Sequence, residues 1–469
     1  MRPNPFASEF LRVESDERAR PQRGMSYAAG ATDEPLRFVT LSALLDDTVA
    51  AHGARDAAIF AASGTRWSWY DLQRRADDVA AALLALGLQP GDRIGIWAHA
   101  CEEWVGTFLG AARIGAIAVA IDPACGEAEL EHALNQTQCR ALMAARAVAS
   151  RDAAQLLAGL LPELDRPADR LRAARVPPLR QVVMLGDAPV PAAAITFRAL
   201  RRLAGPAQRT RVAALGRTID ADHPAGIRFT SAPPGQAKAA LHSHRSLVNS
   251  ALHVARSLAL SERERVCVTA PLHHGIGLVL GMLGCVASGA TMVIPAPAPE
   301  ATLDALVRQR CSRLIVRPAL VESLLESHQA SQLDLSSLRG GFVAGGGCTP
   351  DLLRRAADRL HLADVLTSYG TTQSNHVGLQ PDAGDPPDRR AECAGRVQAH
   401  MEAKLVDADG RIVPVGAPGE LCLRGYPLLS GYWNADGSLQ AATDAAGWLR
   451  TGDRAVMDGA GVCRIVRGP

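Results

Sequence analysis

The chain has 469 residues, of which 48% are hydrophobic and 21% charged, and its formal net charge is +2. This composition is typical of a large globular protein of roughly two or three domains, and the near balance of charge excludes a polyanion-binding surface, so no nucleic-acid partner is expected. The 10 cysteines include no Cys-x-x-Cys pair. That spacing favours reduced thiols in the cytoplasm over a zinc site or a disulfide framework.

Residues 1–36 are expected to form an N-terminal arm, because they begin with a mixture of Arg, Glu, Asp and Pro broken only by short apolar stretches. This pattern fits neither a signal peptide nor a membrane anchor. The most apolar later stretches, residues 106–121 and 266–295, are interrupted by Arg113, by a pair of histidines and by glycines. They predict buried strands and helices, and no integral membrane segment.

Helices and strands alternate along residues 37–387. Asp71 is expected to cap a helix that ends at Gly87, and a turn then leads into a strand over residues 93–97. The alternation continues with helices expected at 102–114, 128–134, 303–309 and 350–360, and with strands expected at 116–121, 140–144, 314–316, 341–344 and 365–367. Such alternation predicts an α/β fold of mostly parallel, helix-covered sheets.

Residues 388–469 show a different pattern, in which short β runs are joined by Asp-Gly turns. The runs expected to be strands are 401–406, 411–415, 420–424 and 454–456. This pattern predicts a β subdomain at the end of the chain.

Residues 230–238, Thr-Ser-Ala-Pro-Pro-Gly-Gln-Ala-Lys, contain the parts of a phosphate-binding loop. Such a loop binds through backbone N–H groups, a glycine, hydroxyls and an ammonium group. The candidate residues are Thr230, Ser231, Gly235 and Lys238. Lys238 is one of only two lysines among 50 basic residues. Pro233 and Pro234 have no N–H to donate, so the loop is expected to bind phosphate weakly. Alternatively, Lys238 is an ordinary surface charge.

Further motifs follow one another in a fixed order over roughly 400 residues, which is more specific than any one glycine motif. They are Arg66-Trp-Ser-Trp-Tyr-Asp-Leu72, Pro271-Leu-His-His274, Tyr369-Gly-Thr-Thr-Gln373, residues 419–433 and Gly447-Trp-Leu-Arg-Thr-Gly-Asp453. In this order they resemble the adenylate-forming (AMP-binding) superfamily of acyl-CoA synthetases, luciferases and peptide-synthetase adenylation domains. Residues 130–136, 334–338 and 424–426 resemble the fatty-acyl-CoA synthetases of the acyl-CoA synthetase family member 2 type.

The resemblance implies the large N-terminal domain of an adenylate-forming enzyme. It also implies ATP, Mg²⁺ and CoA as cofactors and a two-step reaction. A carboxylate attacks the α-phosphate of ATP to give an acyl-adenylate and pyrophosphate, and the CoA thiol then displaces AMP. The partner is expected to be a small carboxylic acid with a medium or long acyl chain; neither its chain length nor an oligomeric state follows from the sequence.

The resemblance also implies roles for individual residues. The catalytic residues are His274, which would gate the carboxylate, Thr372, which would reach the α-phosphate, and Lys238. Asp453 would accept the ribose hydroxyls. The adenine would lie among Gly345, Gly346, Gly347, Tyr369, Gly370 and Thr371. Structural explanations stay open: Asp453 as a turn carboxylate, His274 as a buried histidine with a backbone partner, and the glycines as a turn.

Two features depart from the family pattern. Gln373 stands where the family has an acidic residue that holds Mg²⁺, and a neutral amide brings no negative charge to a metal. The sequence stops at Arg467-Gly468-Pro469, where the family continues through a Gly-Arg hinge into a mobile domain; that domain is expected to be absent.

Three hypotheses follow from these departures. The chain is an acyl-CoA ligase with slow adenylation or a separately supplied C-terminal domain, a non-catalytic relative that binds an acyl group or a nucleotide, or a degenerating product that keeps only the fold. The ligase is the hypothesis adopted here.

Overall fold

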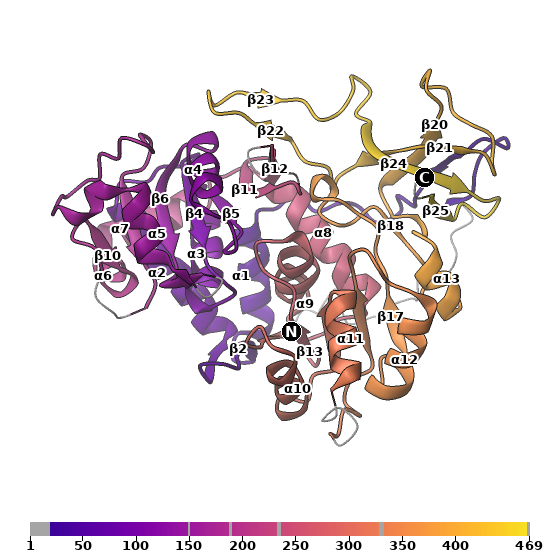
Figure 1. The fold of residues 1–469 in the computed structure, drawn as a ribbon, viewed down its shortest axis with the longest axis horizontal. Helices are drawn as coiled ribbons and strands as arrows, with labels where there is room; N and C mark the ends of the chain where they lie inside the picture. Colours follow the sequence, from indigo (N-terminus) through magenta and orange to yellow (C-terminus); the bar gives the residue numbers. More distant parts are fainter. Residues whose placement is uncertain (1–18, 149–150, 187–189, 232–235, 328–332, 467–469) are drawn as a thin grey trace.

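Two large sheets and one smaller sheet form the framework of the chain in a computed structural model, which describes residues 19–148, 151–186, 190–231, 236–327 and 333–466 (Figure 1). The largest cluster of buried apolar residues contains side chains from β4 (Arg93–Trp97) of one large sheet and β13 (Arg265–Val268) of the other. Helices such as α3 (Glu102–Arg113) and α8 (His244–Ser257) contribute to the same cluster. The two large sheets therefore share one core.

The first large sheet has nine strands and is parallel from β10 to β11, after which β12, β22 and β23 are antiparallel to their neighbours. In spatial order the strands are β10 (Ala194–Thr196), β9 (Gln181–Met184), β6 (Cys139–Ala144), β4, β5 (Ile117–Ile121), β11 (Pro224–Phe229), β12 (Ala239–Ser243), β22 (Gly431–Trp433) and β23 (Leu439–Gln440). Strands β11 and β12 are neighbours and pair antiparallel, and residues 230–238 connect them in the sequence.

The second large sheet has seven strands, and only the β2–β3 pair is antiparallel. In spatial order they are β17 (Asp364–Leu366), β16 (Gly340–Val343), β15 (Arg313–Val316), β13, β14 (Thr291–Ile294), β2 (Asp56–Phe60) and β3 (Thr65–Ser68). Parallel strands bring their carboxyl ends to one edge of a sheet, where such folds bind ligands. His274 follows β13, the glycines follow β16, and Tyr369 follows β17 at this shared edge.

The smaller sheet is antiparallel and holds the described C-terminal end of the chain (Figure 1). Its strands are β1 (Tyr27–Ala29), β20 (Met401–Val406), β21 (Pro418–Gly425), β24 (Leu449–Met457) and β25 (Cys463–Val466). The expected N-terminal arm thus contributes β1 to this sheet, whereas β22 and β23, from the expected β subdomain, join the nine-stranded sheet. Two short pairs complete the strands: β7 (Ala147–Val148) with β8 (Arg151–Asp152), and β18 (Leu379–Gln380) with β19 (Arg396–Val397).

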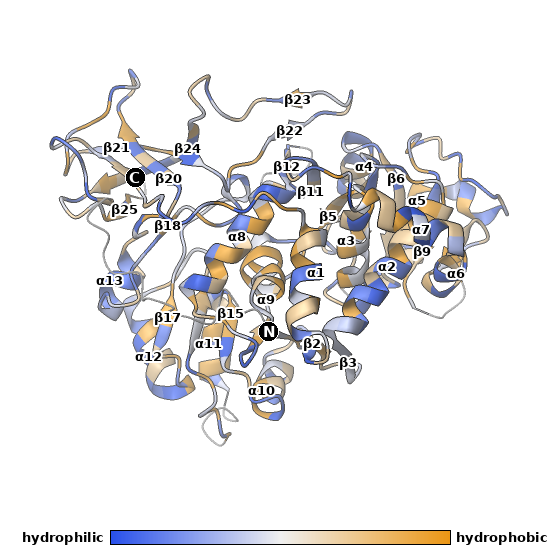
Figure 2. Cartoon of the chain, turned by 180° about the vertical axis from the view of Figure 1, so that it is seen from behind, coloured by the Kyte–Doolittle hydropathy of each residue, from blue (hydrophilic) through white to orange (hydrophobic). Residues whose placement is uncertain are grey.

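Helices cover both large sheets, with apolar residues toward the strands and many polar residues outward (Figure 2). The α-helices besides α3 and α8 are α1 (Leu41–His52), α2 (Trp69–Ala85), α4 (Glu127–Gln136), α5 (Ala153–Leu160), α6 (Phe197–Arg202), α7 (Pro206–Leu215), α9 (Gly284–Ser288), α10 (Pro299–Arg308), α11 (Pro318–Glu326), α12 (Pro350–Leu360) and α13 (Pro387–Glu392). Short 3₁₀ helices span Pro162–Asp165 and Thr372–Ser374, and a π-helix spans Ile276–Leu283.

The expected α/β fold is confirmed by this arrangement, and the helices expected at 102–114, 128–134, 303–309 and 350–360 correspond to α3, α4, α10 and α12. The apolar stretches at 106–121 and 266–295 divide into helices and strands of the core. In the described part of the chain, no helix is both long enough and apolar enough to cross a bilayer.

Two local predictions are wrong. The cap of α2 is Ser68, whose hydroxyl accepts the Asp71 N–H, while the Asp71 carboxylate accepts the Ser68 N–H at 3.1 Å; Asp71 is thus the second half of a capping box. Residues 411–415 form no strand and make only isolated bridges, Val406 with Ile412 and Met25 with Pro414. Proline cannot donate to a ladder, which limits pairing there.

The capping box predicts a stability effect. Ser68→Ala removes the acceptor for the Asp71 N–H and is expected to lower the free energy of unfolding by about 1 kcal/mol. The measurement is the urea midpoint at constant m-value. Ser323→Ala is the matched control, because the Ser323 hydroxyl only bonds back to the Ala319 carbonyl within α11. Equal midpoints for the two variants would contradict the capping role.

Candidate active site

The connection between β11 and β12 is closed at its base by two hydrogen bonds. The Thr230 N–H donates to the Lys238 carbonyl at 3.0 Å, and the Lys238 N–H donates to the Thr230 hydroxyl oxygen at 3.0 Å. Ser231 and Lys238 are exposed, and Thr230 is partly buried. Gly235, the remaining predicted phosphate contact, lies outside the described residues.

Lys238 and Gln373 are brought together through Tyr432 of β22. The Lys238 Nζ lies 5.0 Å from the centre of the Tyr432 ring, which is within the range of a cation–π contact. The Gln373 Nε2 donates to the Tyr432 hydroxyl oxygen at 3.1 Å, and the Gln373 carbonyl accepts the Leu429 N–H. The structure thus joins the lysine of the loop to the Tyr369–Gln373 motif, two segments far apart in the sequence.

Gln373 brings no negative charge to a Mg²⁺ site. Mg²⁺ prefers carboxylate oxygens together with phosphate, but the Gln373 amide is neutral and its nitrogen is engaged by Tyr432. No cluster of three or more His, Cys, Asp or Glu side chains suited to a metal occurs among the described residues. The residues around Gln373 therefore do not fit the metal role.

Tyr369 and Asp453 meet although 84 residues separate them in the chain. The Tyr369 hydroxyl donates to an Asp453 carboxylate oxygen at 2.6 Å. Burial raises the pKa of Tyr369, and the Asp453 charge raises it further. Tyr369 also pairs with Leu379 through two backbone hydrogen bonds, of 2.9 and 3.1 Å. Asp453 is therefore more than a turn residue, because it fixes the ring of Tyr369 and offers carboxylate oxygens beside it.

The turn from Gly370 to Ser374 is held tightly. A Cβ on Gly370 would lie 2.4 Å from the backbone carbonyl carbon of His376, so a larger residue would force the chain apart. The Thr371 N–H donates to the Ser374 hydroxyl oxygen at 3.1 Å, and Thr372 begins the 3₁₀ helix. This packing fixes the backbone position of Thr371 and Thr372 directly after Tyr369 and Gly370.

The glycines after β16 are exposed at the same edge. Gly345 and Gly347 adopt φ of +105° and +96°, a region that favours glycine, and nothing lies within 4 Å of a Cβ built on Gly346 or Gly347. A Cβ on Gly345 would approach Ile276, the second residue after His274. The glycines and the His274 segment are thus neighbours, and the open backbone at 346–347 suits a flat ligand.

His274 is a neutral imidazole at pH 7. Burial lowers its pKa to about 4, and the nearby His273, Arg228 and Arg317 lower it in the same direction. Its Nδ1 accepts the Ile276 N–H at 3.4 Å, and its ring centre lies 4.5 Å from that of His376. His274 therefore has a backbone partner, as expected of a buried structural histidine. Its ring also lies against a second imidazole, that of His376.

Several residues of this site have no role that the sequence motifs predict. Tyr432 lies in a quoted motif, but its contact with Gln373 depends on how β22 joins β12. Arg228 interrupts an otherwise apolar strand, and this pattern predicts a buried charge with a functional role. Asn375 and His376 both adopt positive φ, 56° and 60°, directly after the motif.

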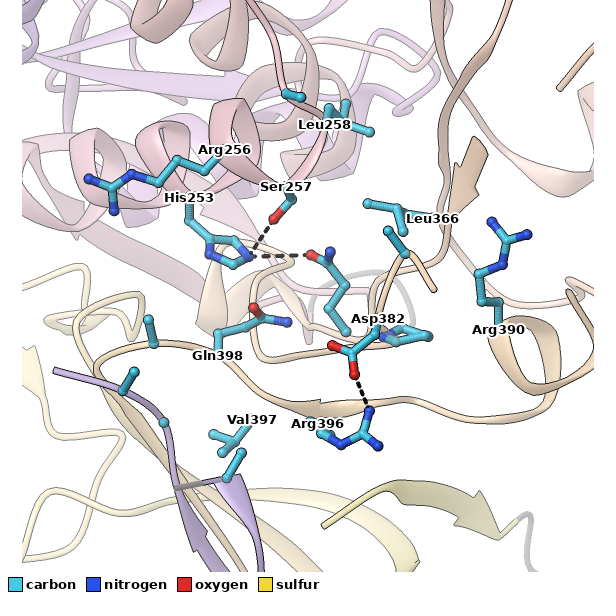
Figure 3. Close-up of a pocket in the computed structure, with 18 of the residues that line it drawn as sticks. His253, Arg256, Ser257, Leu258, Leu366, Asp382, Arg390, Arg396, Val397 and Gln398 are labelled. Atoms are coloured by element: carbon cyan, nitrogen blue, oxygen red, sulfur yellow. Dashed lines mark hydrogen bonds and ion pairs between the residues drawn. The ribbon is translucent and has the colours of Figure 1, made fainter. Parts of the chain in front are cut away.

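A cavity of about 370 Å³ lies elsewhere, between the end of α8 and the segments around β18 and β19 (Figure 3). Within it the His253 Nε2 lies 3.3 Å from the Gln380 Oε1 and 3.2 Å from the Ser257 Oγ. Burial lowers the pKa of His253 to about 4. None of the predicted site residues lines this cavity, so it is separate from the candidate active site.

The model of the AMP-binding enzyme family matches residues 45–433, which is most of the chain. The chain belongs to this family. It is 34% identical over 94% of its length to the acyl-CoA ligase sidI of Aspergillus fumigatus, of which it covers 74%. It is 31% identical over 95% of its length to the mitochondrial medium-chain acyl-CoA ligase ACSF2 of Macaca fascicularis, of which it covers 73%.

Among solved structures, the AMP-binding chain resembles the anthranilate CoA ligase AuaEII in complex with anthranoyl-AMP, with a TM-score of 0.77. The match has 23% identity and covers 92% of this chain and 78% of that one, so it concerns the fold alone. The predicted family, its fold and the class of AMP-forming acid–thiol ligases are confirmed.

The low pKa of His274 predicts a pH effect on stability. The unfolded chain takes up a proton near pH 6.5, whereas native His274 takes it up only near pH 4. The stability that depends on neutral His274 is therefore complete above pH 6.5 and is lost as the pH falls toward 4. Between pH 6.5 and 5 this loss amounts to at most about 2 kcal/mol. His274→Asn is expected to reduce it, as measured by urea unfolding across this range.

Other buried histidines keep their low pKa in that variant, so its stability still falls with pH, but less steeply. His361→Asn is the matched control, because His361 is exposed at the end of α12 with a φ of 57° that asparagine tolerates. It is expected to keep the wild-type slope. If His274→Asn keeps that slope as well, His274 does not have the low pKa.

Proposed function

We propose that the chain is an acyl-CoA ligase that activates a carboxylic acid with ATP and transfers the acyl group to CoA. The observation that carries this proposal is the pairing of Tyr369 with Asp453 at the edge where His274 and Gly345–Gly347 also lie. An aromatic ring, exposed backbone and two carboxylate oxygens form a suitable cradle for a nucleoside. The membership of the AMP-binding enzymes supports the same chemistry.

In the first step a carboxylate oxygen of the acid forms a bond to the α-phosphorus of ATP, and the bond to the bridging oxygen breaks, releasing pyrophosphate. In this proposal Asp453 accepts the ribose hydroxyls, Thr372 donates to the α-phosphate, and Lys238 with Thr230, Ser231 and Gly235 contacts the outer phosphates. His274 orients the carboxylate as a neutral hydrogen-bonding group. No residue is proposed to hold Mg²⁺, because the residues around Gln373 do not fit that ion.

In the second step the CoA sulfur attacks the acyl carbonyl carbon, AMP leaves with the electron pair of the mixed anhydride, and the thiol loses its proton. A medium or long acyl chain is proposed for the acid, and the Macaca fascicularis relative is named a medium-chain acyl-CoA ligase. That relative is named as mitochondrial; a cytoplasmic location for this chain stays a prediction from its cysteines.

A second candidate function is binding of an acyl group or a nucleotide without catalysis. The neutral Gln373, whose amide nitrogen is engaged by Tyr432, favours it. The two functions differ in one measurement, acid-dependent ATP–pyrophosphate exchange, run beside calorimetry with ATP. Exchange supports the ligase, whereas binding without exchange supports the second function and contradicts the first.

Asp453 provides the sharpest test of the nucleotide cradle. Asp453→Ala is expected to lower ATP affinity and the exchange rate with octanoate at least about tenfold, because hydrogen bonds to a carboxylate are strong. Calorimetry and exchange measure the two effects. Asp358→Ala, an exposed carboxylate on α12, is the control and should match the wild type. Unchanged ATP affinity in Asp453→Ala would rule out the ribose contact.

The loop between β11 and β12 gives an independent prediction from the sequence. Replacing Ala232, Pro233 and Pro234 with Gly-Thr-Thr restores two backbone N–H donors and adds two hydroxyls. The variant is expected to bind ATP several-fold more tightly in calorimetry, since anion binding depends on such donors. AMP affinity should stay the same, because AMP has no outer phosphates. If ATP affinity does not rise, residues 230–238 are not a phosphate loop.

A further inference from the structure

Arg228 is a buried cation that forms no ion pair with a carboxylate of the described residues. It lies in β11 and is 3% exposed. Its Nη2 donates to the Asn375 Oδ1, and its Nε has no hydrogen-bond partner. In the described part of the chain no Asp or Glu forms an ion pair with it. A buried charge is costly unless it is paired, so this arrangement calls for an anion from outside the chain.

The other buried arginines, Arg113 and Arg390, have carboxylate or carbonyl partners within the protein, although the Nε of each lacks a hydrogen-bond partner, as the Nε of Arg228 does. Arg113 is 6% exposed and pairs with Asp46 at 2.6 Å and with Asp77 at 2.9 Å. Arg390 is 8% exposed, donates to the Val365 carbonyl at 2.5 Å, and has carboxylates near enough to favour its charge. The contrast lies in the partners: Arg113 has two carboxylates and Arg390 has backbone carbonyls, whereas among the described residues Arg228 has a single amide oxygen.

The titratable neighbours of Arg228 are basic as well. Its charge acts on His242, His274 and His376, and burial is the sole cause that lowers its own pKa, to about 9. Arg228 therefore stays protonated at pH 7, while these imidazoles are neutral donors or acceptors. The Nε2 of His376 is buried without a hydrogen-bond partner, which leaves a second polar group unsatisfied beside the His274 ring.

The position of Arg228 favours a small anion over a polyphosphate. Side chains two residues apart in an extended strand point to the same side, and Lys238 is paired with Thr230, so Arg228, Thr230 and Lys238 lie on one face of the sheet. Arg228 is buried on that face, whereas Lys238 is exposed. The Asn375 amide holds the guanidinium against the end of the 3₁₀ helix that carries Thr372. The charge of Arg228 also acts on His274, where the carboxyl end of the acid would lie.

We propose that Arg228 binds a carboxylate of the acid substrate and so selects anionic acids through a fixed charge behind His274. This inference rests on the proposed function and adds a specificity residue to it. The carboxylate is either the one that becomes activated or a second one on a dicarboxylic acid. A guanidinium with one free edge binds either of them by charge-assisted hydrogen bonds.

The test is calorimetric titration of the chain, with and without AMP, using octanoate, its neutral analogue octanamide, and the eight-carbon dicarboxylate suberate. The wild type is expected to bind a carboxylate at least about tenfold more tightly than octanamide. Arg228→Met should abolish that preference, and Arg228→Lys should keep part of it. Loss of the octanoate preference identifies the reacting carboxylate, and loss of a suberate preference alone identifies a second carboxylate.

Arg113→Met is the matched control, since it removes a buried arginine that is paired within the protein. It is expected to lower the Tm and to keep the carboxylate preference, whereas Arg228→Met should remove that preference. Should Arg228→Met fail to fold, the wild type still decides: octanoate or suberate must raise its Tm more than octanamide does.

The proposal is overturned if the wild type shows no preference for either carboxylate over octanamide, or if Arg228→Met retains the full preference. Neither result bears on ATP–pyrophosphate exchange, which judges the ligase function separately. Conversely, a chain that shows the Arg228-dependent preference but no exchange would keep the carboxylate site and lose the ligase.

Discussion

The side chain of Asn375 connects the parts of the molecule on which the candidate site depends. Its oxygen accepts from Arg228 in β11, and its nitrogen donates to Ser246 of α8 at 2.7 Å and to the Pro427 carbonyl at 3.2 Å. Asn375 adopts a φ of 56°, which asparagine accommodates better than most residues. One buried amide thus links the nine-stranded sheet, the central helix and the segment that follows β21, and it sets the position of the Tyr369–Gln373 motif between them.

Two features make the surroundings of this amide more positive. Gln373 contributes no negative charge where a cation would need it, and Arg228 contributes a positive charge that no carboxylate of the described residues neutralises. The imidazoles of His242, His274 and His376 are neutral at pH 7 because burial lowers their pKa. Such a site favours anionic ligands and disfavours a cation held by the protein. We therefore expect the site to bind an acid more strongly than a metal ion.

Much of the fold was predictable because local patterns and tertiary structure agree. The helix that begins at Trp69 has Leu72, Ala76 and Val79 on one buried face, and the glycine at its end adopts the positive φ that such a stop requires. The cap was misassigned to Asp71 because Ser68 and Asp71 are both capping residues and only the geometry distinguishes their roles. The run at 411–415 was misread because alternation alone does not reveal which partner strand is in reach.

The α/β class, the order of the motifs and the family follow from the amino-acid sequence, since helical and strand periodicity and motif order are properties of the chain alone. Which side chains meet depends on the folded chain. Tyr369 reaches Asp453, Gln373 reaches Tyr432, and Arg228 reaches Asn375 only because separate strands and turns are packed together. Whether a buried charge has a partner depends on such long-range contacts, and for this reason the unpaired Arg228 could be recognised only in the folded chain.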